Sequence, residues 1–404
     1  RRHNPYPPFR GNNREDKFTF DAASPLNPRT LQAAVRALGH LKDHSAVPLL
    51  ASILAENHEP ETANLFLAEA AAEALGWIGT PAAERALIEA FARLGHYRDY
   101  VGWYSDHSAL YACHSSPVHA RIIESLDRIG SSAAGPIVPH LIRSVPTDPD
   151  RALFLQTDTY ELLVGRLIQR SGRDGEVIET CLALLGDPQA QAKPDIRQAL
   201  EVIFNAWAGK PSPENRAAQI LSAACRNRRH SPAVQAAYVR YRASPGELPD
   251  RALGGELLFK VKMPQRHWIL FFLGRTLGNL GDPAAVDTLL ASLAPELNEA
   301  RHGRPNPAYP NVHLLQIDPT PCWRAAAAWA LGRIGDPRAA GMLLEVVANM
   351  DNAVDTRHAA ASALAGAARR EHLAAIGKLA DGYPEVSTRK ALLESIAECE
   401  KAVK

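Results

Sequence analysis

The amino-acid sequence predicts an all-α protein, a right-handed α-solenoid of about eight to ten helix pairs. A phrase consisting of a helix, Leu-Gly, a turn and a second helix recurs along the 404 residues. The copies are spaced roughly 30 to 40 residues apart, a period typical of solenoids. Hydrophobic residues make up 46% of the chain with a large share of alanine, which favours close-packed helices over sheets.

The recurring phrase predicts two helices joined by a short turn. It reads RALGHLKDHSAVPLL from Arg36, EALGWIGTPAAERAL from Glu73, RTLGNLGDPAAVDTL from Arg275 and WALGRIGDPRAAGML from Trp329. Apolar residues before the turn recur at three- and four-residue spacing, so the first helix has one buried face. The apolar run after the turn predicts the second helix.

Each turn has its own local chemistry. A glycine ends the first helix, because it adopts a left-handed conformation without steric cost. A capping residue follows, and then a proline, whose missing N–H is harmless at the first position of a helix. These residues are Gly79, Thr80 and Pro81; Gly281, Asp282 and Pro283; and Gly335, Asp336 and Pro337.

The repeats divide the chain into four expected segments. Residues 1–25 form an extended N-terminal arm or linker, and the absence of a starting methionine indicates processing, truncation or an upstream domain. Helix pairs are expected over 26–147 and 266–404. Residues 148–265 read as divergent helical repeats that continue the stack, or as a separate helical insertion.

These motifs resemble a known family. The run RAAAAWALGRIGDPRA from Arg324 resembles the short HEAT-like repeat first associated with phycobilin lyases, and the other copies resemble HEAT repeats. The resemblance covers 26–147 and 270–380 and implies an α-solenoid. Because such repeats occur in scaffolds, adaptors, regulatory subunits and a few enzymes, the resemblance does not specify a function.

Two insertions depart from the repeat and are the expected partner-binding segments. Residues 95–117 and 295–322 both follow a second helix, so both should leave the stack from the same edge. Their aromatic, histidine and arginine side chains are typical of interface contacts. The expected contact residues are Tyr97, Tyr100, Trp103, Tyr104, His107, Tyr111, His302, Arg304, Tyr309 and His313. Alternatively, the aromatic residues of the first insertion fold back onto the solenoid and the proline-rich second insertion is a rigid surface loop.

A metal site is the weaker interpretation of the first insertion. His107, His114 and His119, with Cys113 and Asp106, supply atoms that zinc accepts, but their spacing matches no compact metal motif. These histidines are equally suited to capping helices and binding loop carbonyl groups. No residue is assigned as catalytic, and no cofactor or bound metal is expected.

One basic cluster raises the possibility of nucleic-acid binding. Residues 226–242 contain five arginines and no acidic residue: Arg226, Arg228, Arg229, Arg240 and Arg242. The alternative is a solvated helix end and turn. The whole chain has 45 Lys+Arg against 44 Asp+Glu, a net charge of +1, so no global field attracts it to nucleic acid.

The cysteines and the lengths of the apolar runs indicate the cellular environment expected for the protein. The five cysteines are widely spaced and form no C-x-x-C pair, so reduced thiols are expected, which favours the cytoplasm without assigning a compartment. No run approaches the 18 or so apolar residues of a membrane span.

The favoured function is a protein-interaction scaffold, or a non-catalytic subunit or domain of a larger assembly. The partner would be another protein or an upstream domain of the same polypeptide, bound through the concave face and the inserted loops. One alternative is a lyase or cofactor-handling protein resembling the bilin lyases. The other is a nucleic-acid-binding solenoid that uses the arginines of 226–242.

Overall fold

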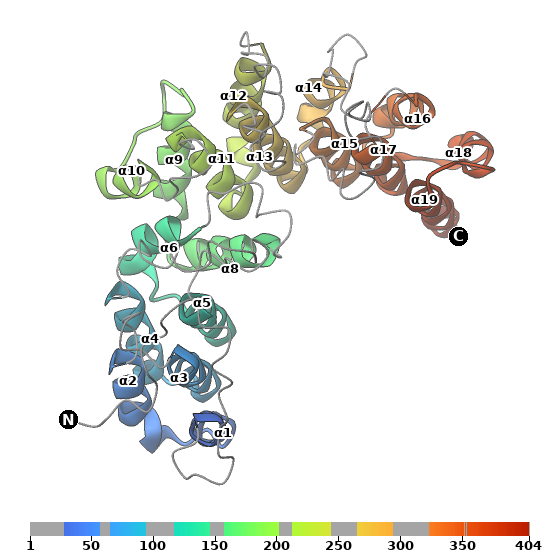
Figure 1. Cartoon of the computed structure of the whole chain (residues 1–404). Coiled ribbons are helices and arrows are strands. Elements are labelled where there is room, and N and C mark those ends of the chain that lie inside the picture. Colours follow the sequence, from blue (N-terminus) through green and yellow to red (C-terminus); the bar gives the residue numbers. More distant parts are fainter. Residues whose placement is uncertain are drawn as a thin grey trace, which may run out of the picture. The chain divides into compact units, whose positions relative to one another are not determined.

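The computed structural model is helical throughout the part of the chain that it describes, which confirms the predicted all-α class (Figure 1). The described residues are 28–56, 65–93, 117–145, 157–201, 212–243, 265–293, 323–350, 352 and 354–403, and no strand occurs among them. The N-terminal arm and nearly all of both insertions lie outside these ranges. Helices in first and second position alternate along the chain, as the recurring phrase predicts.

The helices in first position form rows in which neighbouring helices pack on one another. They are α1 (Pro28–His40), α3 (Leu65–Ile78), α5 (Pro117–Ile129), α8 (Thr157–Arg170), α11 (Pro213–Ala224), α13 (Gln265–Leu280), α15 (Trp323–Ile334), α17 (Val354–Ala367) and α19 (Val386–Val403). Most of them pack directly on the next helix in first position, as α13 does on α15 and α15 does on α17.

The helices in second position are shorter on average and pack mainly against the first helix that follows. They are α2 (Val47–Glu56), α4 (Pro81–Arg93), α6 (Val138–Ser144), α9 (Asp174–Leu184), α12 (Ser231–Ala243), α14 (Val286–Leu290), α16 (Ala340–Ala348) and α18 (Leu373–Ala380). The additional helix α10 (Pro194–Glu201) packs on α6. Short 3-10 helices precede several of these helices, including η5 (Pro283–Ala285) and η6 (Pro337–Ala339).

The chain divides into two compact units. Unit 1 comprises Arg1–Val177 and Lys193–Phe204, and unit 2 comprises Ile178–Ala192 and Asn205–Lys404. Unit 1 contains the row α1, α3, α5 and α8, and unit 2 contains the row α11, α13, α15, α17 and α19. The expected segment boundaries near 148 and 266, which followed the divergence of the repeat, stay a prediction.

The turns have the predicted geometry. Gly79, Gly281 and Gly335 adopt positive φ angles of 66°, 61° and 72°. The Asp282 side chain accepts a hydrogen bond of 3.0 Å from the backbone N–H of Ala284, which caps η5. Asp336 does the same for η6, and Thr80 caps α4 through Oγ1. The local sequence therefore specifies where the first helix ends and how the second begins.

The glycine of each Leu-Gly pair has a role that the sequence reading did not assign. A Cβ atom added at Gly278 would lie 2.8 Å from Ala330 Cα, and one at Gly332 would lie 2.6 Å from Ala363 Cα. Both are too close for real Cβ contacts, so the helices in first position pack backbone to backbone at these glycines. The helices in second position make far fewer contacts with one another. Within unit 2, the row of first helices is therefore the more tightly packed side of the stack.

The described cysteines Cys181, Cys225 and Cys399 are buried and form no disulfide. Within the described ranges, none of the helices has the length and apolar character that crossing a membrane requires.

Candidate functional site

Most residues predicted from the insertions lie outside the described part of the chain. These are Tyr97, Tyr100, Trp103, Tyr104, His107, Tyr111 and His114 of the first insertion, and His302, Arg304, Tyr309 and His313 of the second. The remaining metal candidate, His119, is 8% exposed on α5, with its ring edge-to-face against Phe91 at 5.3 Å between centroids. Among the described residues, no three His, Cys, Asp or Glu side chains cluster as metal ligands would.

The basic cluster of residues 226–242 does not form one patch. Arg228 Nε donates to the carbonyl oxygen of Leu280 at 3.0 Å, and Arg242 donates to that of Thr288 at 3.2 Å. Arg240 donates to the carbonyl of Leu185, and Arg229 donates to the ring of its neighbour His230. Three of these arginines thus bind backbone carbonyl groups of other helices or turns, a structural role that reduces their availability for phosphate groups.

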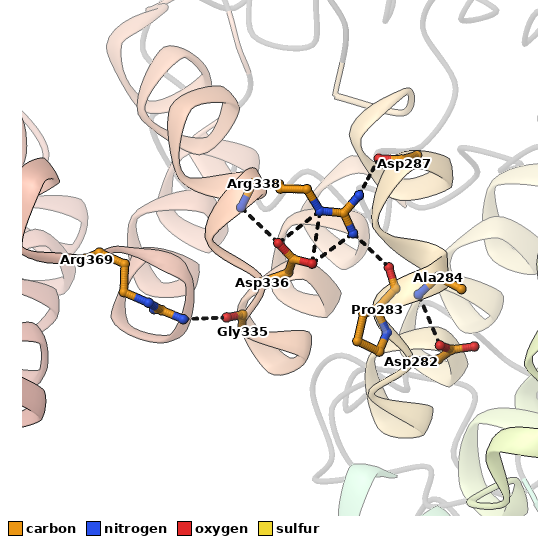
Figure 2. Close-up of polar contacts among 8 residues, drawn as sticks. All are labelled: Asp282, Pro283, Ala284, Asp287, Gly335, Asp336, Arg338 and Arg369. Carbon is orange, nitrogen blue, oxygen red and sulfur yellow. Dashed lines mark hydrogen bonds and ion pairs between the residues drawn. The ribbon is translucent and has the colours of Figure 1, made fainter.

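Arginines also join successive turns of unit 2 (Figure 2). Arg338 pairs with Asp336 in its own turn at 2.8 Å and reaches the preceding repeat, where it contacts Asp287 and the carbonyl of Pro283, both at 3.2 Å. Arg369 donates to the carbonyl of Gly335 at 3.0 Å. Hydrogen bonds from Arg338 lower the pKa of Asp336 below its usual range. These contacts therefore link the turns of successive repeats at the surface.

A different surface of unit 2 gathers charge and aromatic rings. Along α13 and α15, a stripe of partly or fully exposed side chains recurs every four residues on the solvent-facing side of these helices. We call this surface, with the arginine that follows α11, the cationic face. Its members are Arg226, Phe271, Arg275, Trp329 and Arg333.

The indole ring of Trp329 lies at the centre of the cationic face. Arg275 and Arg333 place their guanidinium groups 6.0 and 5.9 Å from its centroid, and Arg275 also lies 5.7 Å from the ring of Phe271. These distances are typical of cation–π contacts. The rings therefore help to hold the two guanidinium groups in place.

Arg226 adds a third charge from the end of α11. Its guanidinium donates to the carbonyls of Ser222 and Cys225 at 3.0 and 2.9 Å. Partial burial lowers its pKa, and the positive charges of Arg275 and Arg333 lower it further. The electrostatic influence of Arg275 and Arg333 on Arg226 shows that the three arginines belong to neighbouring parts of unit 2.

The corresponding face of unit 1 contains several ion pairs. Arg36 pairs with Glu73 at 2.9 Å, and Arg121 pairs with Glu69 at 2.9 Å. Arg166 forms an ion pair of 2.7 Å with Asp127, which also binds Arg170. The first helices of unit 1 are thus joined by ion pairs, with Arg128 over the ring of Trp77, whereas cation–π contacts join α13 and α15 in unit 2.

Asp127 makes the unit 1 ladder sensitive to pH. The hydrogen bond from Arg166 lowers the pKa of this carboxyl, with the charges of Arg166 and Arg170 adding to the effect. Its stabilising contribution should therefore be complete above the unfolded-state pKa near 4 and be lost as pH falls through the lower folded-state value.

We expect Asp127→Asn to lower the free energy of unfolding at pH 7 by roughly 1 kcal/mol, a small value because both arginine side chains are substantially exposed. The difference from the wild type should shrink as pH falls from 5 toward 2 in urea titrations. A penalty that stays constant over that range would show that packing, and not the carboxylate charge, is responsible.

The sequence did not predict the role of three buried or half-buried arginines near the starts of first helices. Arg266, Arg324 and Arg357 donate to carbonyl oxygens at or just beyond the ends of the preceding second helices, at distances of 2.8 to 3.0 Å. The acceptors are the carbonyls of Arg242, Leu293 and Met350. Their signal in the sequence is an arginine that recurs near the start of the helix, as in WRAAA and TRHAA. Such a position usually faces solvent, so the sequence did not indicate burial.

Comparisons with known proteins agree with the repeat architecture. The HEAT repeat family model matches residues 20–95, and the PBS lyase HEAT-like repeat model matches residues 266–294 and 323–349. No curated protein sequence matches the chain.

Several solved structures are distantly similar to the chain. One is human deoxyhypusine hydroxylase in complex with glycerol, which is 17% identical, with 94% of this chain and 100% of that one covered and a TM-score of 0.27. An engineered protein is 14% identical, with 93% and 97% covered and a TM-score of 0.29. The complex of CpcE and CpcF of phycocyanin lyase from Nostoc sp. PCC7120 is 15% identical, with 95% and 98% covered and a TM-score of 0.25. Similarity this low has no bearing on function.

Proposed function

Because this chain is built from HEAT and PBS-lyase-type HEAT-like repeats in an all-α solenoid, we propose that it is a protein-interaction scaffold or a non-catalytic subunit of a larger assembly. Its partner is another protein or another domain of the same polypeptide. The partner binds along the row of first helices in unit 2, with the insertions 95–117 and 295–322 supplying further contacts.

The cationic face is the observation that supports this proposal most strongly. Trp and Arg are the residue types most enriched in the hot spots of protein interfaces. Trp329 is half-buried, so part of its surface can contact a partner. Backbone packing at Gly278 and Gly332 holds the helices that carry these residues in fixed positions, which lowers the entropic cost of binding.

We propose that the second insertion contributes a further contact near the start of α15. Residues 295–322 end where α15 begins, and α15 carries Trp329 and Arg333. His302, Arg304, Tyr309 and His313 are therefore proposed to contact the partner from this end of the helix. The aromatic residues of the first insertion would form a separate contact in unit 1.

The test compares the native complex of the wild type with that of a face variant. We expect a partner polypeptide to co-purify stoichiometrically with the wild type, and its recovery to fall at least tenfold for Trp329→Ala/Arg333→Ala. Loss of two central contacts should remove more than 1.4 kcal/mol of binding free energy, which is a factor of ten.

The matched control is Lys378→Ala, which removes an exposed charge from α18, a helix in second position of the same unit. Its recovery of the partner should equal that of the wild type. Purification of a monomer that carries a bound chromophore would instead favour the lyase or cofactor-handling alternative and contradict the scaffold.

A further inference from the structure

One line of side chains along α1 is exposed where the same line of the next first helix is buried. In α3, the side chains of Ala70, Ala74 and Ile78 follow one another at intervals of four residues, and none is more than 6% exposed. The copies RALGHL and EALGWI align the two helices. The corresponding residues of the first repeat are Ala33, Ala37 and Leu41. Both of these alanines are exposed, and the leucine is 77% exposed.

In later repeats, the position of Ala37 receives a glycine from the preceding first helix. A Cβ atom added at Gly39 of α1 would lie 2.5 Å from Ala74 Cα, so Gly39 packs directly on α3. Other pairs with this close contact are Gly76 and Ser125, Gly278 and Ala330, and Gly332 and Ala363. Each receiving residue is small and directly precedes a leucine, as Ala37 does. Among the described residues no helix precedes α1, so Ala37 carries the receiving half of this contact without a glycine against it.

The second helix of the first repeat is open on the matching side. Leu49 of α2 is 56% exposed, whereas its counterpart Ala86 in α4 is half-buried. The two residues correspond because each directly precedes a fully buried leucine, Leu50 in α2 and Leu87 in α4. Ala86 lines a small cavity between α2 and α4, so this position lies toward the preceding second helix. We call the surface formed by Ala33, Ala37, Leu41 and Leu49 the end face.

We infer that the end face binds a helix pair of the same HEAT-like type from another polypeptide. The first helix of that pair places the glycine of a Leu-Gly motif against Ala37, as α1 places Gly39 against Ala74. Its second helix covers Leu49. Burial of Leu41 and Leu49 supplies apolar free energy, and the glycine lets the two backbones approach closely. The end face belongs to unit 1, so this inference does not depend on the cationic face of unit 2.

A second copy of this chain fits the end face less well. The last described helix, α19, contains no glycine. Most of its exposed side chains are charged: Arg389, Lys390, Glu394, Glu398, Glu400 and Lys401. Such side chains would lose water if they were buried against an apolar surface. Two copies that met through their end faces would pair alanine with alanine and would bring no glycine to the contact.

The experiment adds a labelled helix pair to the full chain and follows fluorescence anisotropy. The probe is a peptide with the sequence of residues 323–349, because this segment places Gly332 against a following first helix in its own repeat stack. A control peptide carries Gly332→Ala. The full chain is tested as the wild type, as Ala37→Glu, and as Ala397→Glu, which makes the same exchange at an exposed site on α19.

We expect the wild type to bind the unmodified peptide at least ten times more tightly than the Gly332→Ala peptide. Alanine is the better helix former, so weaker binding of that peptide cannot result from lost helicity. Ala37→Glu should weaken binding of the unmodified peptide at least tenfold, because a carboxylate would be buried at the contact. Ala397→Glu should alter binding less than twofold. Thermal unfolding followed by circular dichroism verifies that both variants fold.

Each other outcome contradicts the inference. Equal binding of the two peptides would show that the glycine contact does not form, and no binding of either would show that the end face does not accept a helix pair. Equal weakening in both glutamate variants would place the binding elsewhere.

Two results would assign the end face to a different occupant. Peptide binding that appears only after removal of residues 1–20 would mean that the chain's own N-terminal segment covers this surface. A wild-type dimer in light scattering that Ala37→Glu converts to a monomer would make a second copy the occupant. Neither result affects the scaffold proposed above, which is tested separately with Trp329→Ala/Arg333→Ala.

Discussion

Replacement of Gly332 by alanine should lower the free energy of unfolding of unit 2 by about 1–3 kcal/mol, the usual penalty for overpacking. The new Cβ atom would lie 2.6 Å from Ala363 Cα and 2.8 Å from Ala363 Cβ, so α15 and α17 would have to move apart. Backbone atoms cannot rotate away as a flexible side chain can. Urea denaturation followed by circular dichroism measures the loss, and hydrogen exchange should show lower protection in both helices.

Gly377→Ala is the matched control for this variant. Gly377 lies within α18, and a Cβ atom there would meet nothing within 4 Å. Because alanine is the better helix former, this change should raise the free energy of unfolding by roughly 0.5–1 kcal/mol. The propensity gain is shared by both sites, so the difference between the variants isolates the close contact. Equal effects at the two positions would mean that the Leu-Gly glycine does not determine helix packing.

Replacement of Arg357 by methionine should lower the free energy of unfolding by about 3–5 kcal/mol, as expected when one partner of a buried ion pair is removed. The Arg357 side chain is only 6% exposed and forms an ion pair with Glu385. It also donates to the carbonyls of Met350 and Asn352. Methionine fills similar space but leaves the carboxylate and both carbonyls without this donor. Urea titration at pH 7 measures the change.

Two further variants separate charge burial from lost packing. Arg389→Met makes the same exchange at an exposed site on α19 and should change stability by less than about 0.5 kcal/mol. Arg357→Met/Glu385→Gln removes both charges and should recover part of the loss, because no unpaired carboxylate remains. A double variant that is less stable than Arg357→Met would contradict the ion pair as the source of the effect.

Turn chemistry could be predicted from the sequence because it is local. Gly281 ends a helix by its own conformational freedom, and Asp282 caps the next element through a residue two positions away. The same local chemistry occurs where the signature varies. In the first copy, Lys42 takes the place of glycine with a φ of 52°, and Asp43 still supplies the cap.

The candidate site could be predicted only in part. Arg226 was identified from its position in a run of arginines, but its electrostatic neighbours are Arg275 and Arg333 of the following repeats. The nearby Arg228 instead binds the backbone of Leu280. Charge density along the sequence indicated a cluster, while helix packing decided which arginines share one surface.

The sequence alone determined the helical class, the repeat and the geometry of each turn, because these depend on residues within a few positions of one another. Only the tertiary structure decided what Gly332, Arg357 and Trp329 do. Their contacts are Ala363, Glu385 and Arg275, which belong to neighbouring repeats. Such contacts depend on how closely and at what register the first helices pack, and that packing is a property of the whole stack.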